Sequence, residues 1–220
     1  MLLRIYETLL EFFGFQNWWP TKSGNKAEEI IIGAVLTQQT AWRNVEKSID
    51  NLINAGCLSL KRISGMKLKE IENLIRPCGF YRLKAKRLKE ISMYFSKRYG
   101  NLRRFFEKPL EECRKELLSL NGIGYETCDA ILLYAGNKPI FVVDRYTYRI
   151  LSRAGIWSGK FRYEALRTFI ESQVPRDVKL YKEFHALFDE LAKNYCKSKP
   201  LCKDCPLKEM CKFEEKNCKR

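Results

Sequence analysis

Four cysteines near the C-terminus have a spacing that suits metal binding. They fall within sixteen residues in the pattern Cys-x5-Cys-x2-Cys-x5-Cys. Thiolates in such a set can hold either a [4Fe–4S] cluster or a structural zinc ion. Zinc ribbons usually present two CxxC pairs, whereas this segment has one. The four predicted ligands are Cys196, Cys202, Cys205 and Cys211.

A second stretch joins a glycine turn to a single carboxylate. The turn, Asn121-Gly122-Ile123-Gly124, separates two apolar helical patterns, and Asp144 follows after a loop that contains glycine and proline. Backbone amides of the turn, together with the positive N-terminus of the next helix, can hold a phosphate oxygen whatever the base sequence. An ordinary αα-hairpin with a glycine cap is the alternative for the turn. Asp144 can also be a helix N-cap, and an N-cap can still face a cleft.

The composition indicates a polyanionic partner. The chain has 220 residues, with 41 Lys and Arg against 26 Asp and Glu, for a formal charge of +15. No apolar run approaches the roughly 20 residues that span a bilayer, and the basic residues are spread along the chain, so a membrane is disfavoured. The N-terminal apolar pattern contains acidic residues and predicts a helix instead of a signal peptide. Nine cysteines then indicate an intracellular, reducing location with metal ligands or buried thiols.

Apolar residues recur at helical spacing through most of the chain, and no segment alternates strongly enough to predict a strand. The sequence therefore predicts an all-α protein. The expected helices cover approximately residues 2–13, 28–36, 42–53, two short helices within 60–76, and then 84–95, 109–118, 125–135, 145–154, 162–173 and 178–195.

The motifs L-N-G-I-G-Y-E-T, G-N-K-P and V-V-D-R-Y resemble the signature of the helix–hairpin–helix DNA glycosylases of the endonuclease III superfamily. The similarity extends from Trp18 to Cys211. It implies two helical lobes with the active site in the cleft between them. One lobe, residues 21–135, would hold six helices and end with the hairpin. The other would combine residues 1–20 with 136–220 and carry the [4Fe–4S] loop at residues 196–211.

The resemblance also implies how the protein grips double-stranded DNA. Gly122, Ile123 and Gly124 would hold a phosphate, and Gln38 of the L-T-Q-Q-T segment would enter the gap left by an extruded base. A glutamine can bond an orphaned base with either end of its amide. Phe80 or Tyr81 is the candidate for an intercalating wedge, with a core aromatic at a helix entry as the alternative for either residue.

For the chemistry, the resemblance implies that Asp144 stabilises an oxocarbenium-like sugar and orients or deprotonates a water. The bifunctional branch has a lysine nucleophile just inside the second hairpin helix, where this chain has Glu126. A carboxylate cannot form a Schiff base, so we expect a monofunctional, hydrolytic glycosylase.

The segments N-W-W-P, L-T-Q-Q-T-A-W and G-I-G-Y-E-T-C-D-A-I look most similar to the endonuclease III-type 3-methyladenine DNA glycosylases. That subfamily implies a base pocket for alkylated purines, which carry positive charge, so aromatic faces and an anion suit them. The expected pocket residues are Trp18, Trp19, Pro20, Trp42 and Glu126. The expected partner is double-stranded DNA with a damaged base, bound by a monomer.

Three alternatives stay open. The first is a glycosylase of another specificity, such as mismatched thymine or adenine, or an oxidised pyrimidine. The second is a bifunctional lyase that uses a lysine from elsewhere in the chain, such as Lys138. The third, from another functional class, is a non-catalytic iron–sulfur module that binds DNA and senses damage or redox state.

Overall fold

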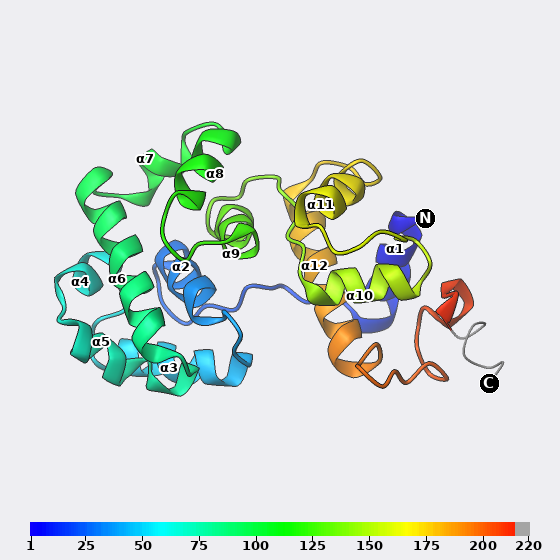
Figure 1. Cartoon of the computed structure of the whole chain (residues 1–220), viewed down its shortest axis with the longest axis horizontal. Helices are drawn as coiled ribbons and strands as arrows, with labels where there is room; N and C mark the ends of the chain where they lie inside the picture. Colours follow the sequence, from blue (N-terminus) through cyan, green and yellow to red (C-terminus); the bar gives the residue numbers. More distant parts are fainter. Residues whose placement is uncertain (214–220) are drawn as a thin grey trace. The chain divides into compact units, whose positions relative to one another are not determined.

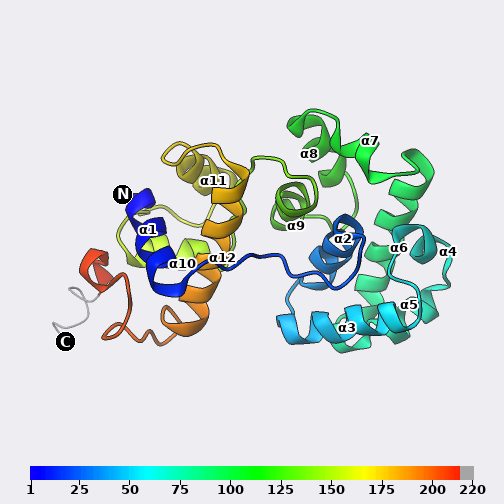
Figure 2. The ribbon, with the colours of Figure 1, turned by 180° about the vertical axis from the view of Figure 1, so that it is seen from behind.

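The computed structural model describes residues 1–213 and contains no β-strand among them. These residues divide into two compact units. Unit 1 comprises residues 1–18 and the chain after residue 138, and unit 2 comprises residues 19–138. Figures 1 and 2 show that each unit consists of packed helices. The predicted all-α class is therefore confirmed, and no helix in the described part is long and apolar enough to cross a membrane.

Unit 2 is built around α2 (Lys26–Leu36), which is apolar on nearly every side. The Asn25 side chain caps this helix by accepting a hydrogen bond from the Glu28 amide. From Ile30 to Leu36 every residue is buried, because α2 packs against α3, α6, α9 and the π-helical turn η2. The helices of unit 2 after α2 are α3 (Trp42–Asn54), α4 (Leu60–Gly65), α5 (Leu68–Leu74), η1 (Arg76–Cys78), α6 (Tyr81–Arg98), α7 (Leu102–Phe106), α8 (Leu110–Leu118), α9 (Tyr125–Ala130) and η2 (Ile131–Ala135).

Unit 1 packs α12 (Val178–Asn194) against α1 (Leu2–Phe13) and α10 (Arg145–Arg153). Its core is aromatic: Phe141, Tyr181 and Phe184 are fully buried, and the Phe141 ring lies 5.5 Å from that of Tyr181. Edge-to-face ring pairs of this kind add to the stabilisation from burial alone. The remaining elements of unit 1 are α11 (Tyr163–Glu171) and η3 (Lys208–Met210).

Helix positions agree with the expected ones, with one addition. Unit 2 holds eight α-helices among the described residues, α2–α9, where the resemblance implies six. Helix α7 is the one that the apolar pattern does not predict. It is five residues long, is capped by Asn101, and buries only Phe105, so it offers no second turn over which a 3.6-residue period can be recognised.

Candidate active site

The glycine turn forms the predicted helix–hairpin–helix between α8 and α9. Gly122 has a φ of +79°, which an L side chain rarely adopts, and a Cβ there would lie 2.2 Å from Nε of Arg87. Ile123 is buried and anchors the turn, while Gly124 is exposed and begins α9. The first amides of α9 have no intrahelical acceptor. The turn therefore presents backbone N–H donors to solvent and is held in place by the buried side chain of Ile123.

Gln38 supports this hairpin from the loop after α2. Its Nε2 donates to the carbonyl oxygen of Gly122 and to the hydroxyl of Thr127, at 3.0 Å in each case. Its Oε1 accepts a hydrogen bond from the guanidinium of Arg87. Both ends of the Gln38 amide are thus engaged inside unit 2, and its predicted contact with DNA stays a prediction. The neighbouring Gln39 is exposed and has a φ of +52°.

The wedge candidates Phe80 and Tyr81 lie at the start of α6. Phe80 caps the helix with left-handed backbone (φ 44°, ψ 26°), and its side chain is 66% exposed. Left-handed backbone is unusual for a bulky residue. Tyr81 is the first residue of α6, half-buried, with the guanidinium of Arg76 5.8 Å from its ring centre. Of the two, Phe80 has the exposure that a wedge requires.

The two tryptophans of the N-W-W-P segment belong to different units. Trp18 lies in unit 1, with the Lys193 ammonium 5.8 Å from its ring centre. Trp19 lies in unit 2, where its ring centre is 5.5 Å from those of both Trp42 and Tyr134.

Trp19, Pro20 and Trp42 line one cavity of unit 2, together with Gly33, Glu29 and Glu46. Gly33 lets the indole approach α2, since a Cβ there would lie 3.0 Å from Cζ2 of Trp19. Lys22 lines the cavity too, and its ammonium pairs with Asp50 at 2.6 Å. An indole face attracts a cation. Trp18 and Glu126 are not among the residues that line this cavity. Glu126 lies on the exposed first turn of α9.

Buried carboxylates hold the chain on both sides of the tryptophan pair. In unit 1, Glu183 is 2% exposed and accepts hydrogen bonds from the amides of Gln16 and Asn17. In unit 2, Glu29 is 3% exposed and accepts from the amides of Lys22 and Ser23, at 2.8 and 2.7 Å. These bonds satisfy otherwise orphaned backbone donors. They fix the segments that lead into and out of Trp18-Trp19-Pro20.

Asp144 is the N-cap of α10, as the capping alternative predicted. Its Oδ1 accepts hydrogen bonds from the amide of Thr147 at 2.6 Å and from the hydroxyl of Thr147 at 2.8 Å. Within residues 1–213 its Oδ2 makes no hydrogen bond. Since the cap uses one oxygen, the other remains able to act on a substrate.

Lys138, the alternative nucleophile, is engaged elsewhere. Its ammonium donates to the carbonyl oxygen of Lys108 at 2.6 Å. This bond holds the loop after η2 against the end of α7. Asn137 in the same loop has a φ of +50°, and at Gly136 a Cβ would lie 2.5 Å from the Phe106 ring. Glycine is therefore required at position 136 because the Phe106 ring packs directly against it.

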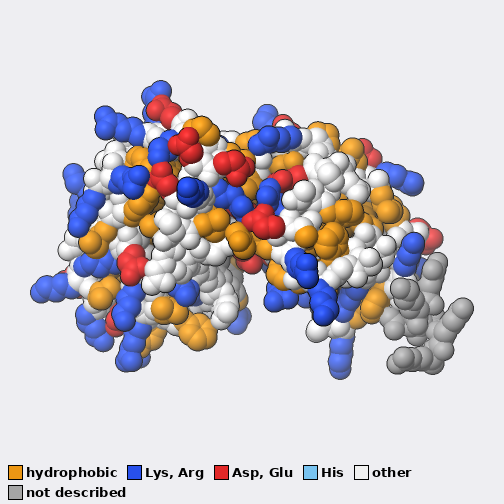
Figure 3. Space-filling view, turned by 45° about the horizontal axis from the view of Figure 1, so that its top comes forward, with side chains coloured by type: hydrophobic (Ala, Val, Ile, Leu, Met, Phe, Trp, Pro, Cys, Tyr) orange, Lys and Arg blue, Asp and Glu red, His pale blue; other side chains and the backbone are white. Residues whose placement is uncertain are grey.

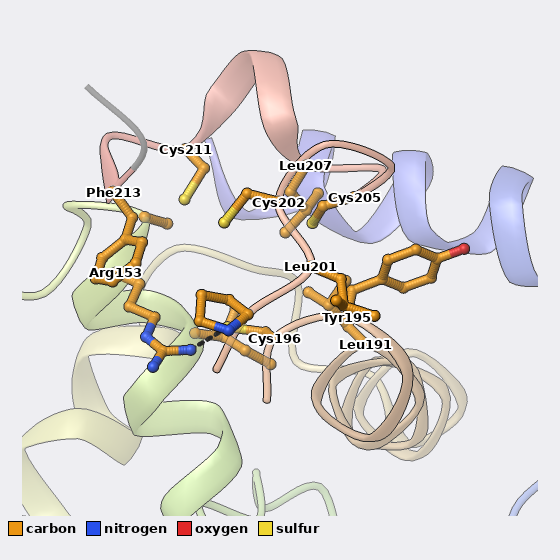
Figure 4. Close-up of a pocket in the computed structure, with 13 residues that line it drawn as sticks. Arg153, Leu191, Tyr195, Cys196, Leu201, Cys202, Cys205, Leu207, Cys211 and Phe213 are labelled. Atoms are coloured by element: carbon orange, nitrogen blue, oxygen red, sulfur yellow. Dashed lines mark hydrogen bonds between the residues drawn. The ribbon is translucent and has the colours of Figure 1, made fainter. Parts of the chain in front are cut away.

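The four predicted ligand cysteines line one cavity of unit 1 (Figure 4). All four come from the chain after α12, and Cys196 lies beside Arg153, whose Nη1 donates to its sulfur at 3.4 Å. Among the described residues, no three His, Cys, Asp or Glu side chains converge closely enough to hold one metal ion. Zinc would need all four sulfurs at about 2.3 Å from one ion. A [4Fe–4S] cluster distributes its thiolates over four irons, so this donor set fits a cluster better than zinc.

Basic side chains are spread over much of the molecular face shown in Figure 3. They alternate there with acidic and apolar groups. Such a distribution can attract a polyanion without choosing its sequence.

Sequence patterns missed several residues that the structure brings to these sites. Gln39 and the helical Gly33 could have been noticed from their place beside predicted features. Tyr134, Glu29 and Glu183 gave no signal, because apolar spacing does not distinguish a core tyrosine from a pocket tyrosine, nor a buried carboxylate from a solvated one.

These features define a class: an all-α protein with a helix–hairpin–helix, a downstream capping carboxylate and a four-cysteine cavity. The model of the HhH-GPD superfamily of base excision DNA repair proteins matches residues 32–176. The chain belongs to this superfamily.

Individual relatives agree with the family assignment. "Putative DNA repair glycosylase MJ1434" of Methanocaldococcus jannaschii is 44% identical over 96% of both chains. The crystal structure of the H. pylori 3-methyladenine DNA glycosylase MagIII bound to 1,N6-ethenoadenine is similar with a TM-score of 0.76 and 31% identity, covering 87% of this chain and 97% of that one. A non-covalent endonuclease III–DNA complex gives a TM-score of 0.82 at 21% identity, over 100% and 99% of the two chains. This last similarity confirms the two-lobed endonuclease III fold.

Proposed function

We propose that this DNA glycosylase is monofunctional and releases alkylated purines such as 3-methyladenine. The observation that carries the proposal is the cavity where the indoles of Trp19 and Trp42 lie beside Glu29 and Glu46. A base methylated at N3 or N7 is a flat cation, and the face of an electron-rich ring attracts a cation by about 0.5–2 kcal/mol. The 31% identity to a 3-methyladenine glycosylase supports this substrate class.

Asp144 is the proposed catalytic residue. Its Oδ1 stays with the α10 cap, and its Oδ2 stabilises positive charge on the sugar as the N-glycosidic bond breaks. The bonding electrons leave with the base, which becomes neutral if it was cationic. A water then adds to the sugar carbon and loses its proton, with Asp144 orienting it. The leaving base needs no strong acid, because it is already positively charged.

Trp18 and Glu126 keep their proposed base-pocket roles, although neither lines the Trp19 cavity. For DNA contact we propose Gly122–Gly124 at a phosphate and Phe80 at the opened base step. Gln38 keeps its proposed DNA-binding role, and Gln39 is a further candidate for the gap, because Gln39 is exposed while the amide of Gln38 is engaged by the hairpin and Arg87. The exposed Gln39 can bond the orphaned base that flipping leaves behind.

The cysteine cavity is proposed to hold a [4Fe–4S] cluster through Cys196, Cys202, Cys205 and Cys211. When bound, the cluster would order the loop after α12 and present its lysines to DNA phosphates. The protein is proposed to act as an intracellular monomer on double-stranded DNA.

Base release from methylated DNA tests the proposal. Purified protein is incubated with duplex DNA treated with a methylating agent, and the released bases are separated by chromatography. We expect 3-methyladenine in the supernatant, with release reduced by Trp42→Ala and largely retained by Trp42→Phe, which keeps an aromatic face. Parallel duplexes with mismatched thymine, mismatched adenine or an oxidised pyrimidine test the other specificities. Release from one of those duplexes without release of methylated purines would refute the proposed substrate class.

A further inference from the structure

Lys84 is a buried cation that bonds only neutral groups. It lies on the first turn of α6, is 1% exposed, and its ammonium donates to the carbonyl oxygen of Leu36, the hydroxyl of Thr40 and the carbonyl oxygen of Cys78, at 2.8, 2.6 and 2.9 Å. These three acceptors use all three ammonium donors. Desolvation lowers the pKa of Lys84, and the nearby Arg87 lowers it further.

The three acceptors come from two separate turns. Leu36 ends α2 directly before the Gln39 turn, residues 37–40, and Thr40 is the last residue of that turn. Cys78 begins the Phe80 turn, residues 78–81. The hydroxyl of Thr40 also donates to the carbonyl oxygen of Cys78, so a direct bond joins the same two turns. A single ammonium and a single hydroxyl therefore hold both turns together from beneath.

Each turn presents an exposed residue in left-handed backbone. Gln39 has a φ of +52° and Phe80 a φ of +44°, and neither is glycine. Such conformations persist only where the surrounding structure fixes them. Lys84 and Thr40 supply the bonds that fix these two, since their acceptors lie within three residues of both tips.

Stability alone does not explain a lysine here. An apolar side chain of similar length would fill the same space without the cost of desolvating an ammonium. The carbonyl of Leu36 at the negative end of α2 offsets part of that cost. An apolar side chain would bond neither turn, whereas the ammonium bonds both at once.

We propose that Lys84 is a positioning residue that locks the Gln39 and Phe80 turns into one rigid surface, so that both tips enter damaged duplex DNA together. This inference rests on the proposed function for its DNA readout. The wedge (Phe80) and the gap-filling side chain (Gln39) act on neighbouring base steps. A small shift of one relative to the other would therefore remove much of the affinity that a preorganised surface gives.

The test compares Lys84→Met and Thr40→Val with the wild type. For each protein the dissociation constant is measured for a duplex with a tetrahydrofuran abasic analogue and for the same duplex without damage. We expect Lys84→Met to lower the preference for the damaged duplex roughly tenfold, with binding to undamaged duplex unchanged. Thr40→Val, which removes one hydroxyl from the same junction, should lower it less. An unaltered preference in both variants would overturn the inference.

Leu88→Ala is the matched control. Leu88 lies one turn further along α6, is fully buried, and has no polar atom to bond either turn. Its truncation should lower the melting temperature while the preference for damaged DNA is kept. A loss of preference in Leu88→Ala equal to that in Lys84→Met would show a general structural effect and overturn the positioning role.

Hydrogen exchange gives a readout that needs no DNA. Amides of residues 37–41 and 79–82 should exchange faster in Lys84→Met, in both segments together. Faster exchange in one segment alone would contradict the coupling. If the wild type shows no preference for damaged DNA, the proposed function fails, and this measurement still decides whether Lys84 joins the turns.

Discussion

The guanidinium of Arg114 forms a bidentate ion pair with the carboxylate of Asp129, with Nε–Oδ1 and Nη2–Oδ2 distances of 2.8 and 3.1 Å. Asp129 is fully buried, and Arg114 is 9% exposed. The pair joins α8 to α9 across the glycine turn. It therefore sets the angle at which the hairpin meets its helices.

Removal of one partner of this pair should destabilise the protein strongly. Asp129→Ala leaves the Arg114 charge buried without its carboxylate, at a cost of about 3–5 kcal/mol in the free energy of unfolding. The double substitution Arg114→Met with Asp129→Leu should cost much less, because no charge is then buried. Urea denaturation of both variants checks this. Equal losses would show that packing volume, not charge pairing, determines the stability of the hairpin.

Substitution of Asp144 should separate catalysis from capping. Asp144→Asn keeps an Oδ1 that can accept from the Thr147 amide, and asparagine is as good an N-cap as aspartate. We expect an unchanged melting temperature and a fall in base release of about 10²–10⁴-fold. Asp144→Ala should lose about 0.5–2 kcal/mol of stability as well. Asp144→Asn with wild-type base release would refute the catalytic assignment.

Local sequence patterns predict most of the helices and the hairpin turn. The helices of 9 residues or more carry apolar periodicity, so α2, α6 and α12 were predicted, whereas the short α7 was not. The hairpin glycines were recognised because turn chemistry is local. Gln38 and Gln39 have the same side chain in the same loop, and only the backbone of the turn determines that one faces the hairpin and the other faces solvent.

The spacing of apolar and charged residues along the chain does not reveal contacts between segments that are distant in sequence. Glu29 and Glu183 look like ordinary helical carboxylates, and their burial depends on backbone amides that approach from distant segments. Nothing in the spacing around Lys84 marks it as buried, because its ammonium bonds the carbonyl oxygens of residues 48 and 6 positions before it.

The position of Glu126 predicts that the protein has no lyase activity. Because a carboxylate cannot form a Schiff base, borohydride should trap no covalent complex between the wild type and abasic DNA. Glu126→Lys places an amine on the first turn of α9, where the positive helix end favours its neutral, nucleophilic form. A trapped adduct should then appear. Trapping by the wild type would contradict the monofunctional assignment. In that case, borohydride trapping with the Lys138→Ala variant would test whether Lys138 is the nucleophile.

Glu116 should contribute an acid-dependent component of stability. Burial alone would raise its pKa, but hydrogen bonds from Lys108, Tyr94 and Tyr99 outweigh burial and lower the pKa from 4.5 to about 2. A depressed carboxyl pKa stabilises the fold above pH 4.5, and this stabilisation is lost as pH falls towards 2.

Glu116→Gln should therefore lower the free energy of unfolding at pH 7 by on the order of 1–2 kcal/mol and flatten its slope between pH 4.5 and 2. Chemical denaturation across this range measures both effects. A variant that keeps the wild-type slope would show that other carboxylates cause the acid dependence.

Cysteine substitutions should distinguish the cluster from zinc and from unligated thiols. Cys202→Ala removes a thiol from the cavity of unit 1, whereas Cys57→Ala removes one from unit 2 that does not line it. We expect the wild type to contain iron and sulfide with broad visible absorbance, Cys202→Ala to lose both, and Cys57→Ala to retain them. Elemental analysis that finds zinc without iron would favour a single ion, which would require the four sulfurs to draw together around it.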